Sequence, residues 1–272
     1  MLKKILYIFY YFIKLVDKFF YFLTQKSILS YFKDFIHQDS NKSLTILNQN
    51  IKFFIPNQIT EWRVDTFFSK EPETLDWIDK FNFQEKIIFW DIGANIGLYS
   101  LYAGIKHKNI EIVSFEPSSS NLRVLSRNIS LNKLQDKIKI FQIALTNKEN
   151  KFLYMREPDF IEGGALNSFG ETFNFEGKDF TSKMNYKIFG TTINYLLKNN
   201  ILKVPNYIKI DVDGIEHLIL EGGSHFLNDN KIKSISVEIN ENFEDQYKST
   251  MKIMKENNFE LIQKKHNTDL DN

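Results

Sequence analysis

One stretch decides the fold of this 272-residue chain: Ile87-Ile88-Phe89-Trp90-Asp91-Ile92-Gly93-Ala94-Asn95-Ile96-Gly97. Residues 87–90 form a short apolar run without polar alternation, which is typical of a strand covered on both faces. Gly93 allows a tight turn where a Cβ would clash, and Gly97 lets a following helix pack close to the strand. The stretch therefore predicts a buried strand, a glycine turn and a helix.

Acidic residues follow two of the predicted strands. Asp91 lies at the carboxyl end of the first, and Glu116 follows the next, 110–115. Open α/β sheets bind ligands at this edge, where Asp91 can meet the ammonium group of an amino acid and Glu116 can accept both ribose hydroxyls. Asn95 stands where the dinucleotide fingerprint Gly-x-Gly-x-x-Gly needs its second glycine, which disfavours a pyrophosphate. The pattern predicts S-adenosylmethionine as the ligand.

Strands and helices alternate along the rest of the chain. This alternation predicts an α/β fold with a doubly wound, mostly parallel sheet. Upstream of the first buried strand, residues 51–68 are expected to form two short strands or extended pieces around Pro56. Further strands are expected at 138–145, 207–212, 232–239 and 259–264, and helices at 73–81, 119–131, 193–199, 217–220 and 243–257.

A second group of acids follows the expected strand 207–212. Asp211 and Asp213 lie at its carboxyl end, and Glu216 lies in the turn after it. Three interpretations remain open. Asp211 or Asp213 acts as general base or orients a hydroxyl group; Asp211, Glu238 and Asn240 gather a hard divalent cation; or the acids cap the next helix. We expect Asp211, Asp213 and Glu216 to be the catalytic group, without a metal.

Three segments in order resemble the FkbM-type methyltransferases. They are Asp91-Ile92-Gly93-Ala94-Asn95-Ile96-Gly97-Leu98-Tyr99-Ser100, Phe115-Glu116-Pro117 and Ile210-Asp211-Val212-Asp213-Gly214-Ile215-Glu216. The resemblance spans about 55–265 and includes Lys70-Glu71-Pro72-Glu73-Thr74 and Gly163-Gly164-Ala165-Leu166-Asn167-Ser168-Phe169. One departure is Asp213, where many members carry Glu.

The resemblance implies a class I, S-adenosylmethionine-dependent methyltransferase with a Rossmann-like sheet. Such enzymes are often O-methyltransferases of sugars or natural products, so we expect methylation of a saccharide or small-metabolite hydroxyl. By analogy with the family, Ala144 and Leu145 lie near the adenine ring. The expected cofactor-binding residues are Asp91, Gly93, Ala94, Asn95, Gly97, Glu116, Pro117, Ala144 and Asp211.

Composition limits the other functions. The net charge is +1, which argues against nucleic acid as the main partner, and the absence of cysteine excludes disulfides and thiolate chemistry. An NAD-linked oxidoreductase and a non-catalytic, membrane-associated binding module on the same fold are the alternatives. Asn95 counts against the first, and the acids Asp91, Glu116 and Asp211 count against the second.

The first 36 residues differ from the rest in composition. They carry a net charge of +4, so the remaining chain carries −3. At helical spacing, three lysines, three tyrosines and a glutamine form one narrow stripe, and apolar residues fill the rest of the circumference; the stripe contains Lys4, Tyr7, Tyr11, Lys14, Lys18, Tyr21 and Gln25. An amphipathic helix of this kind suits a membrane interface, although packing on the catalytic domain or a second subunit is the alternative.

These patterns predict two regions. Residues 1–50 contain the N-terminal helix and a polar linker over 37–50, and residues 51–272 form the methyltransferase domain. Within it, the glycine-containing segment 150–185 is expected to be a substrate lid, with a plain surface β-excursion as the alternative. We expect a cytoplasmic protein, in contact with the inner face of the membrane through residues 1–36.

Overall fold

The computed structural model describes residues 2–82, 84–179 and 181–265. The chain divides into two compact units, Met1–Lys42 and Ser43–Asn272. Each unit is described by itself.

The first unit consists of two helices, where the sequence suggested one. Helix α1 covers Leu2–Thr24 and α2 covers Ile28–Asp39. The chain turns between them at Gln25, whose φ is 58°, and Ser27 caps α2 by accepting a hydrogen bond from the backbone N–H of Ser30. Among the described residues, no helix is both long enough and apolar enough to cross a bilayer.

A hairpin occupies much of the stretch expected to be a linker. Strands β1 (Asn41–Ile46) and β2 (Gln49–Phe54) pair across Leu47 and Asn48, which both have positive φ. Two such residues make the tight turn that matches the twist of paired strands. The linker prediction was therefore wrong for residues 41–50, because Ile46 and Phe53 bury their side chains in the core.

The segment after the hairpin is helical rather than extended. Helix α3 (Gln58–Asp65) begins at Asn57, whose side chain and Thr60 form a capping box. Helix α4 (Pro72–Asp79) follows. It begins at Pro72, and proline is favoured in the first turn of a helix.

The central sheet of the second unit is entirely parallel. Its order is β11-β10-β3-β4-β5, with bounds Ser234–Val237, Tyr207–Ile210, Ile87–Ile92, Ile110–Phe115 and Ile138–Phe141. Strand β3 lies in the middle, and the chain leaves it first toward β4 and later returns on its other side to β10. This doubly wound topology confirms the predicted α/β fold class.

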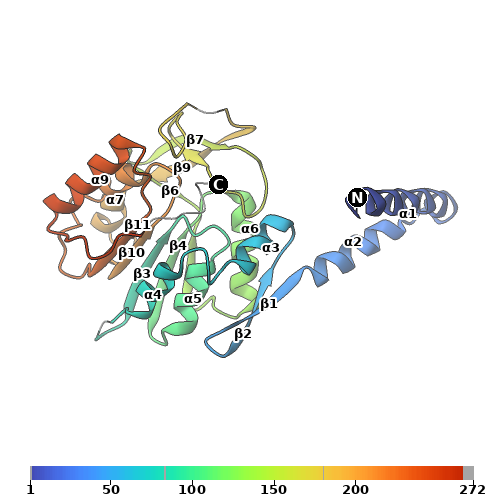
Figure 1. Cartoon of the computed structure of the whole chain (residues 1–272), viewed down its shortest axis with the longest axis horizontal. Coiled ribbons are helices and arrows are strands. Elements are labelled where there is room, and N and C mark those ends of the chain that lie inside the picture. Colours follow the sequence, from blue (N-terminus) through green and yellow to red (C-terminus); the bar gives the residue numbers. More distant parts are fainter. Residues whose placement is uncertain (1, 83, 180, 266–272) are drawn as a thin grey trace. The chain divides into compact units, whose positions relative to one another are not determined.

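Helices cover both faces of this sheet (Figure 1). Helices α4, α5 (Leu98–Lys106) and α6 (Ser119–Leu131) contribute to one core with Phe89 and Ile112. Helices α7 (Ile193–Lys198), α8 (Glu216–Glu221) and α9 (Glu244–Glu256) contribute to the other with Trp90 and Val113. Consecutive strand residues thus alternate between two buried faces, which explains the continuous apolar runs.

A second sheet lies beyond the carboxyl ends of the first. It has the order β6-β9-β7-β8, with bounds Ala144–Leu145, Met184–Thr191, Lys151–Glu157 and Ser168–Phe169. The expected strand 138–145 is therefore two strands in different sheets. The segment 150–185 contains β7, β8 and the start of β9, and the residues between these strands are mainly loop. The strand expected at 259–264 is absent from the described residues, and Ile262 is exposed there.

Candidate active site

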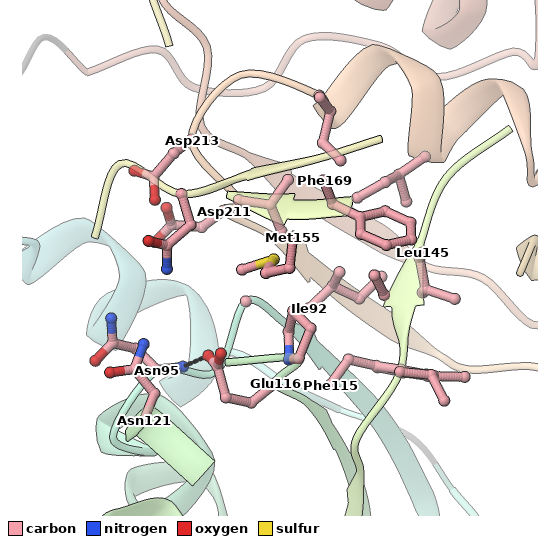
Figure 2. Close-up of a pocket in the computed structure, with 18 of the residues that line it drawn as sticks. Ile92, Asn95, Phe115, Glu116, Asn121, Leu145, Met155, Phe169, Asp211 and Asp213 are labelled. Carbon is pink, nitrogen blue, oxygen red and sulfur yellow. Dashed lines mark hydrogen bonds between the residues drawn. The ribbon is translucent and has the colours of Figure 1, made fainter. Parts of the chain in front are cut away.

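A cavity of about 70 Å³ lies at the carboxyl ends of β3, β4 and β10. This is the point where the direction of the crossover connections reverses, and open α/β sheets bind their ligands there. Figure 2 shows side chains from both sheets around it. Its polar and small lining residues are Gly93, Asn95, Glu116, Pro117, Asn121, Ala144, Gly164, Asn167, Asp211 and Asp213; its larger apolar ones include Ile92, Phe115, Ile143, Leu145, Met155 and Phe169.

Gly93 allows β3 and β10 to end next to each other. Its φ is +85°, and a Cβ on it would lie 1.8 Å from the backbone oxygen of Asp211. No side chain fits at that distance. The glycine therefore brings the turn after β3 against the acidic end of β10, although the two are more than a hundred residues apart.

Glu116 is buried at the end of β4. One carboxylate oxygen accepts a 2.7 Å hydrogen bond from the backbone N–H of Asn95, and the other a 2.8 Å bond from that of Ser118. Burial raises the pKa of Glu116 to about 8, and these two N–H groups oppose the shift. Since each carboxylate oxygen can accept a second bond, Glu116 retains acceptor capacity at the cavity.

Asn95 joins the glycine turn to the loop around Gly164. The residue has a φ of 50°, a conformation that asparagine tolerates better than most residues. Its Nδ2 donates a 2.8 Å hydrogen bond to the backbone oxygen of Gly164, whereas its buried Oδ1 has no partner among the described residues. The cavity wall thus contains an acceptor that a bound molecule could satisfy.

The loop 161–167 crosses one side of the cavity and is fixed at both ends. Asn121 binds it twice, donating to the oxygen of Gly164 at 3.1 Å and accepting from the N–H of Gly163 at 2.8 Å. Asp213 accepts a 2.7 Å bond from the N–H of Leu166. We name residues 161–167 the strap; it belongs to the segment predicted to be a substrate lid.

Asp213 has the electrostatic properties expected of a base. Its φ is +63°, and it lines the cavity. Burial and the neighbouring Asp211 raise its pKa to about 6, although the N–H of Leu166 and Arg63 act in the opposite direction. Near neutral pH its carboxylate is therefore ionised but still basic enough to accept a proton.

Asp211 forms an ion pair with a residue that the sequence reasoning missed. The Nζ of Lys209, a side chain that is only 4% exposed, lies 2.5 Å from Oδ2 of Asp211. Burial raises the pKa of Asp211, but the ammonium group outweighs it and holds the pKa below its usual value. Burial likewise opposes the charge on Lys209, whose pKa is nevertheless raised by the carboxylates of Asp211, Glu71 and Asp91.

Two further titratable groups, Tyr99 and Glu238, lie next to this pair. The Lys209 ammonium lies 4.8 Å from the centre of the Tyr99 ring. The charge of Asp211 and a hydrogen bond with it raise the pKa of Glu238 well above its ordinary value. We name Asp91, Tyr99, Lys209, Asp211 and Glu238 the ionic cluster. Lys209 could have been recognised as the one charged residue in the buried strand 207–210.

Asp91 lies outside the lining of the cavity. It is in register with Lys209, and both point to the α4–α5 face, whereas Ile92 next to it points to the cavity. The Oγ of Ser100 donates a 2.5 Å hydrogen bond to Oδ2 of Asp91, and Oδ1 is buried without a partner among the described residues. Burial raises the pKa of Asp91 despite Lys209.

Two other predicted residues, Ala94 and Gly97, lie outside the lining, whereas Gly93 is part of it. The N–H groups of Gly93 and Ala94 both donate to the oxygen of Phe115, so these two residues tie the turn to β4. Gly97 has a φ of +87° and lies against Leu125, where it begins α5.

Glu216 supports the loop that contains Asp213. Its carboxylate accepts hydrogen bonds from the N–H groups of Val212 and Gly214, both at 3.0 Å, and from Nε2 of Gln246 at 2.5 Å. These two N–H groups belong to the loop before α8, whose N-cap Ile215 has no side-chain capping hydrogen bond, so Glu216 holds this loop and does not cap the helix. In the parts of the chain that the structure describes, no three His, Asp or Glu side chains are placed to hold a metal ion together.

Comparison with known proteins identifies the family. The model of the methyltransferase FkbM domain matches residues 91–261, which is more than half of the chain. Methyltransferase sdnD of Sordaria araneosa is 38% identical over 81 residues, a match that covers 30% of this chain and 31% of that protein. The chain therefore matches less than a third of the length of that relative.

Solved structures show weak likeness. The precorrin-6y C5,15-methyltransferase of Geobacter metallireducens GS-15 has a TM-score of 0.41 and 13% identity, over 70% of this chain and 72% of that one. An S-adenosylmethionine-dependent methyltransferase of Agrobacterium tumefaciens has a TM-score of 0.28 and 11% identity, over 39% and 33%. The assignment rests on the family match, and this chain belongs to the FkbM family of S-adenosylmethionine-dependent methyltransferases.

Proposed function

We propose that this protein methylates a hydroxyl group of a saccharide or another small metabolite. The observation that carries the proposal is one cavity lined by Asn95, Glu116 and Asp213, which come from three separate segments of the chain. It combines hydrogen-bond acceptors with an apolar wall, and it contains a carboxylate able to take up a proton.

The residues present fit S-adenosylmethionine. The ribose hydroxyls and the ammonium group of this cofactor are hydrogen-bond donors, and the cavity offers the acceptors Glu116 and Asn95, whose Oδ1 is unsatisfied within the described residues. The apolar wall of Ile143, Ala144 and Leu145 suits an adenine ring. When bound, the cofactor supplies an electrophilic methyl group.

The protein's own residues then have distinct tasks. Asp213 would accept the proton that the acceptor hydroxyl loses while its oxygen takes up the methyl group and S-adenosylhomocysteine leaves. Asp211, which Lys209 keeps ionised, orients the hydroxyl group as an acceptor. Glu216 is a positioning residue, because it holds the backbone on either side of Asp213. The strap excludes water from this side of the cavity.

The test of the proposal is product analysis. The full chain is incubated with methyl-labelled S-adenosylmethionine and a panel of monosaccharides, oligosaccharides and small hydroxylated metabolites, and mass spectrometry locates the transferred methyl group. We expect a methyl ether on a hydroxyl oxygen. A methyl group found on nitrogen or carbon would contradict O-methylation, while leaving the family assignment intact.

Glu116→Ala is expected to weaken binding of S-adenosylhomocysteine by about 1–3 kcal/mol, because the donors of the ligand lose a buried hydrogen-bond acceptor. This corresponds to a loss of affinity of roughly tenfold to a hundredfold in titration calorimetry. The matched control is Glu111→Ala, at the other end of the same strand, which should bind as the unaltered chain does. Equal affinities of the Glu116 and Glu111 variants would place the ribose elsewhere.

The pH dependence of turnover should follow the ionisation of the Asp213 carboxyl group. Since its pKa is about 6 and the base must be ionised, kcat/KM is expected to fall below pH 6 by about tenfold per pH unit. Asp213→Asn should lower turnover by roughly 10²–10⁴-fold. It should also remove the acidic limb of the pH profile, which is the fall in kcat/KM below pH 6. Asp136→Asn, an exposed residue far from the cavity lining, should keep the limb. A limb that persists in the Asp213 variant would assign the base to another group.

A further inference from the structure

The first unit presents a large apolar surface without a core of its own. Neither α1 nor α2 contains a buried residue. Sixteen large apolar or aromatic side chains of α1 are between 37% and 77% exposed, and Tyr31, Phe32, Phe35 and Ile36 of α2 are exposed as well. Exposed apolar surface of this extent marks an interaction site, because leaving it in water is costly.

The charges of α1 are gathered on one side. At 100° per residue, Lys3, Lys4, Lys14 and Lys18 fall within one narrow stripe, and Phe9 and other apolar residues lie opposite. The Nζ of Lys14 lies 5.7 Å from the centre of the Tyr10 ring, so this lysine extends along the helix surface.

The single acid of α1 is engaged within the unit. Asp17 accepts hydrogen bonds from Oγ of Ser27 and from the N–H of Leu29, each at 3.0 Å. These donors belong to the start of α2, where a negative charge is favourable, and they lower the pKa of Asp17. The carboxylate thus fixes the bend between the helices, and the lysine stripe keeps its positive charge.

The width of the apolar surface indicates what covers it. A helix that pairs with a second copy has a narrow apolar seam flanked by polar residues. In α1 the proportions are reversed, since the polar stripe is narrow and the apolar residues fill the remaining circumference. A lipid surface accommodates such a helix, with apolar side chains among the acyl chains and lysines and tyrosines at the headgroups.

We propose that α1 and α2 form a membrane-surface anchor that binds anionic bilayers. Helix α1 lies in the plane of the interface, its lysine stripe faces the phosphate groups, and Phe9, Val16 and Phe20 enter the acyl region. The lysines make binding selective for anionic lipids, and salt screens this electrostatic part of the affinity. The aromatic residues contribute an apolar part that salt does not screen.

The experiment is vesicle flotation of the full chain. Phosphatidylglycerol–phosphatidylethanolamine vesicles are compared with phosphatidylcholine vesicles at low and high salt. We expect the chain to float with the anionic vesicles, and binding to weaken as salt is raised. Replacing Lys3, Lys4, Lys14 and Lys18 with glutamine should weaken this binding roughly tenfold or more. The control replaces Lys108, Lys198, Lys203 and Lys255, four exposed lysines of the second unit, and should bind as the original chain does.

A second pair of variants tests the apolar face. Phe9→Ser with Phe20→Ser should reduce flotation with anionic vesicles at least tenfold, whereas Phe152→Ser with Ile262→Ser, at exposed positions of the second unit, should leave it unchanged. Unfolding curves show whether each variant keeps its folded second unit. The proposal fails if the original chain does not float with anionic vesicles, or floats equally well after both sets of changes in α1. A stable dimer formed through α1 that persists with vesicles would assign the surface to a second copy.

Discussion

Gly93→Ala is expected to destabilise the second unit by about 3 kcal/mol or more and to abolish binding of S-adenosylhomocysteine. The new Cβ would lie 1.8 Å from the backbone oxygen of Asp211, and alanine is strained at a φ of +85°. Neither conflict can be relieved by a side-chain rotation, so the turn and the end of β10 must separate. Chemical denaturation and titration calorimetry measure the two effects.

Gly104→Ala provides the matched control. This glycine lies in the last part of α5, and a Cβ there would meet Ile112, Ile138 and Leu134 at 3.6–3.7 Å, which is ordinary contact. Because alanine favours a helix more than glycine does, the change should be neutral or stabilise by roughly 0.5–1 kcal/mol. If both variants unfold and bind alike, the close approach of the two strand ends is not needed for the site.

Lys209→Met is expected to destabilise the fold by roughly 3–5 kcal/mol at neutral pH. The change leaves Asp211, whose side chain is only 22% exposed, ionised without its partner, and removing one member of a largely buried pair has this cost. Denaturation curves at pH 7 measure it. Lys139→Met removes an exposed partner of Glu111, whose ion pair lies at the surface, and should cost no more than about 1 kcal/mol.

The pH dependence of this loss follows from the pKa of Asp211. Lys209 holds that pKa below 3.8, so the pair stabilises the native state above the unfolded pKa, and this contribution is lost as the pH falls through the folded value. The difference between the original chain and Lys209→Met should therefore shrink as the pH is lowered from 7 toward 4 and below. The double variant Lys209→Met with Asp211→Asn should be more stable than Lys209→Met alone. A constant difference with pH would show that lost packing, rather than the charge, is responsible.

The sequence was sufficient to predict those parts of the fold and of the site that a local pattern of residues determines. The apolar run 87–90, the turn at Gly93 and the acid at Glu116 predicted the central strands and the edge where the cavity lies. A parallel strand buried on both faces has few alternatives, and an acid at its end has a defined place in the sheet. These features need only neighbouring residues to specify them.

The features that the sequence did not predict depend on contacts between segments that are far apart in the chain. Strand β6 has two residues and forms only because β9, some forty residues later, pairs with it. Ile46 and Phe53 make residues 41–54 a hairpin because a core is present to bury them, which the polar composition did not indicate. Alternation along β3 also turned Asp91 toward Lys209 and away from the cavity. Side-chain direction on a strand reverses at each residue, so the contact with Lys209 depends on register, and contact of Asp91 with a ligand stays a prediction.

The most direct test of the site is titration calorimetry of the full chain with S-adenosylhomocysteine and, in parallel, with NAD. We predict roughly micromolar binding of S-adenosylhomocysteine that Glu116→Ala weakens, and no binding of NAD. Binding of NAD without S-adenosylhomocysteine, or S-adenosylhomocysteine affinity unchanged in the Glu116 variant, would contradict the cofactor site described at the ends of β3, β4 and β10.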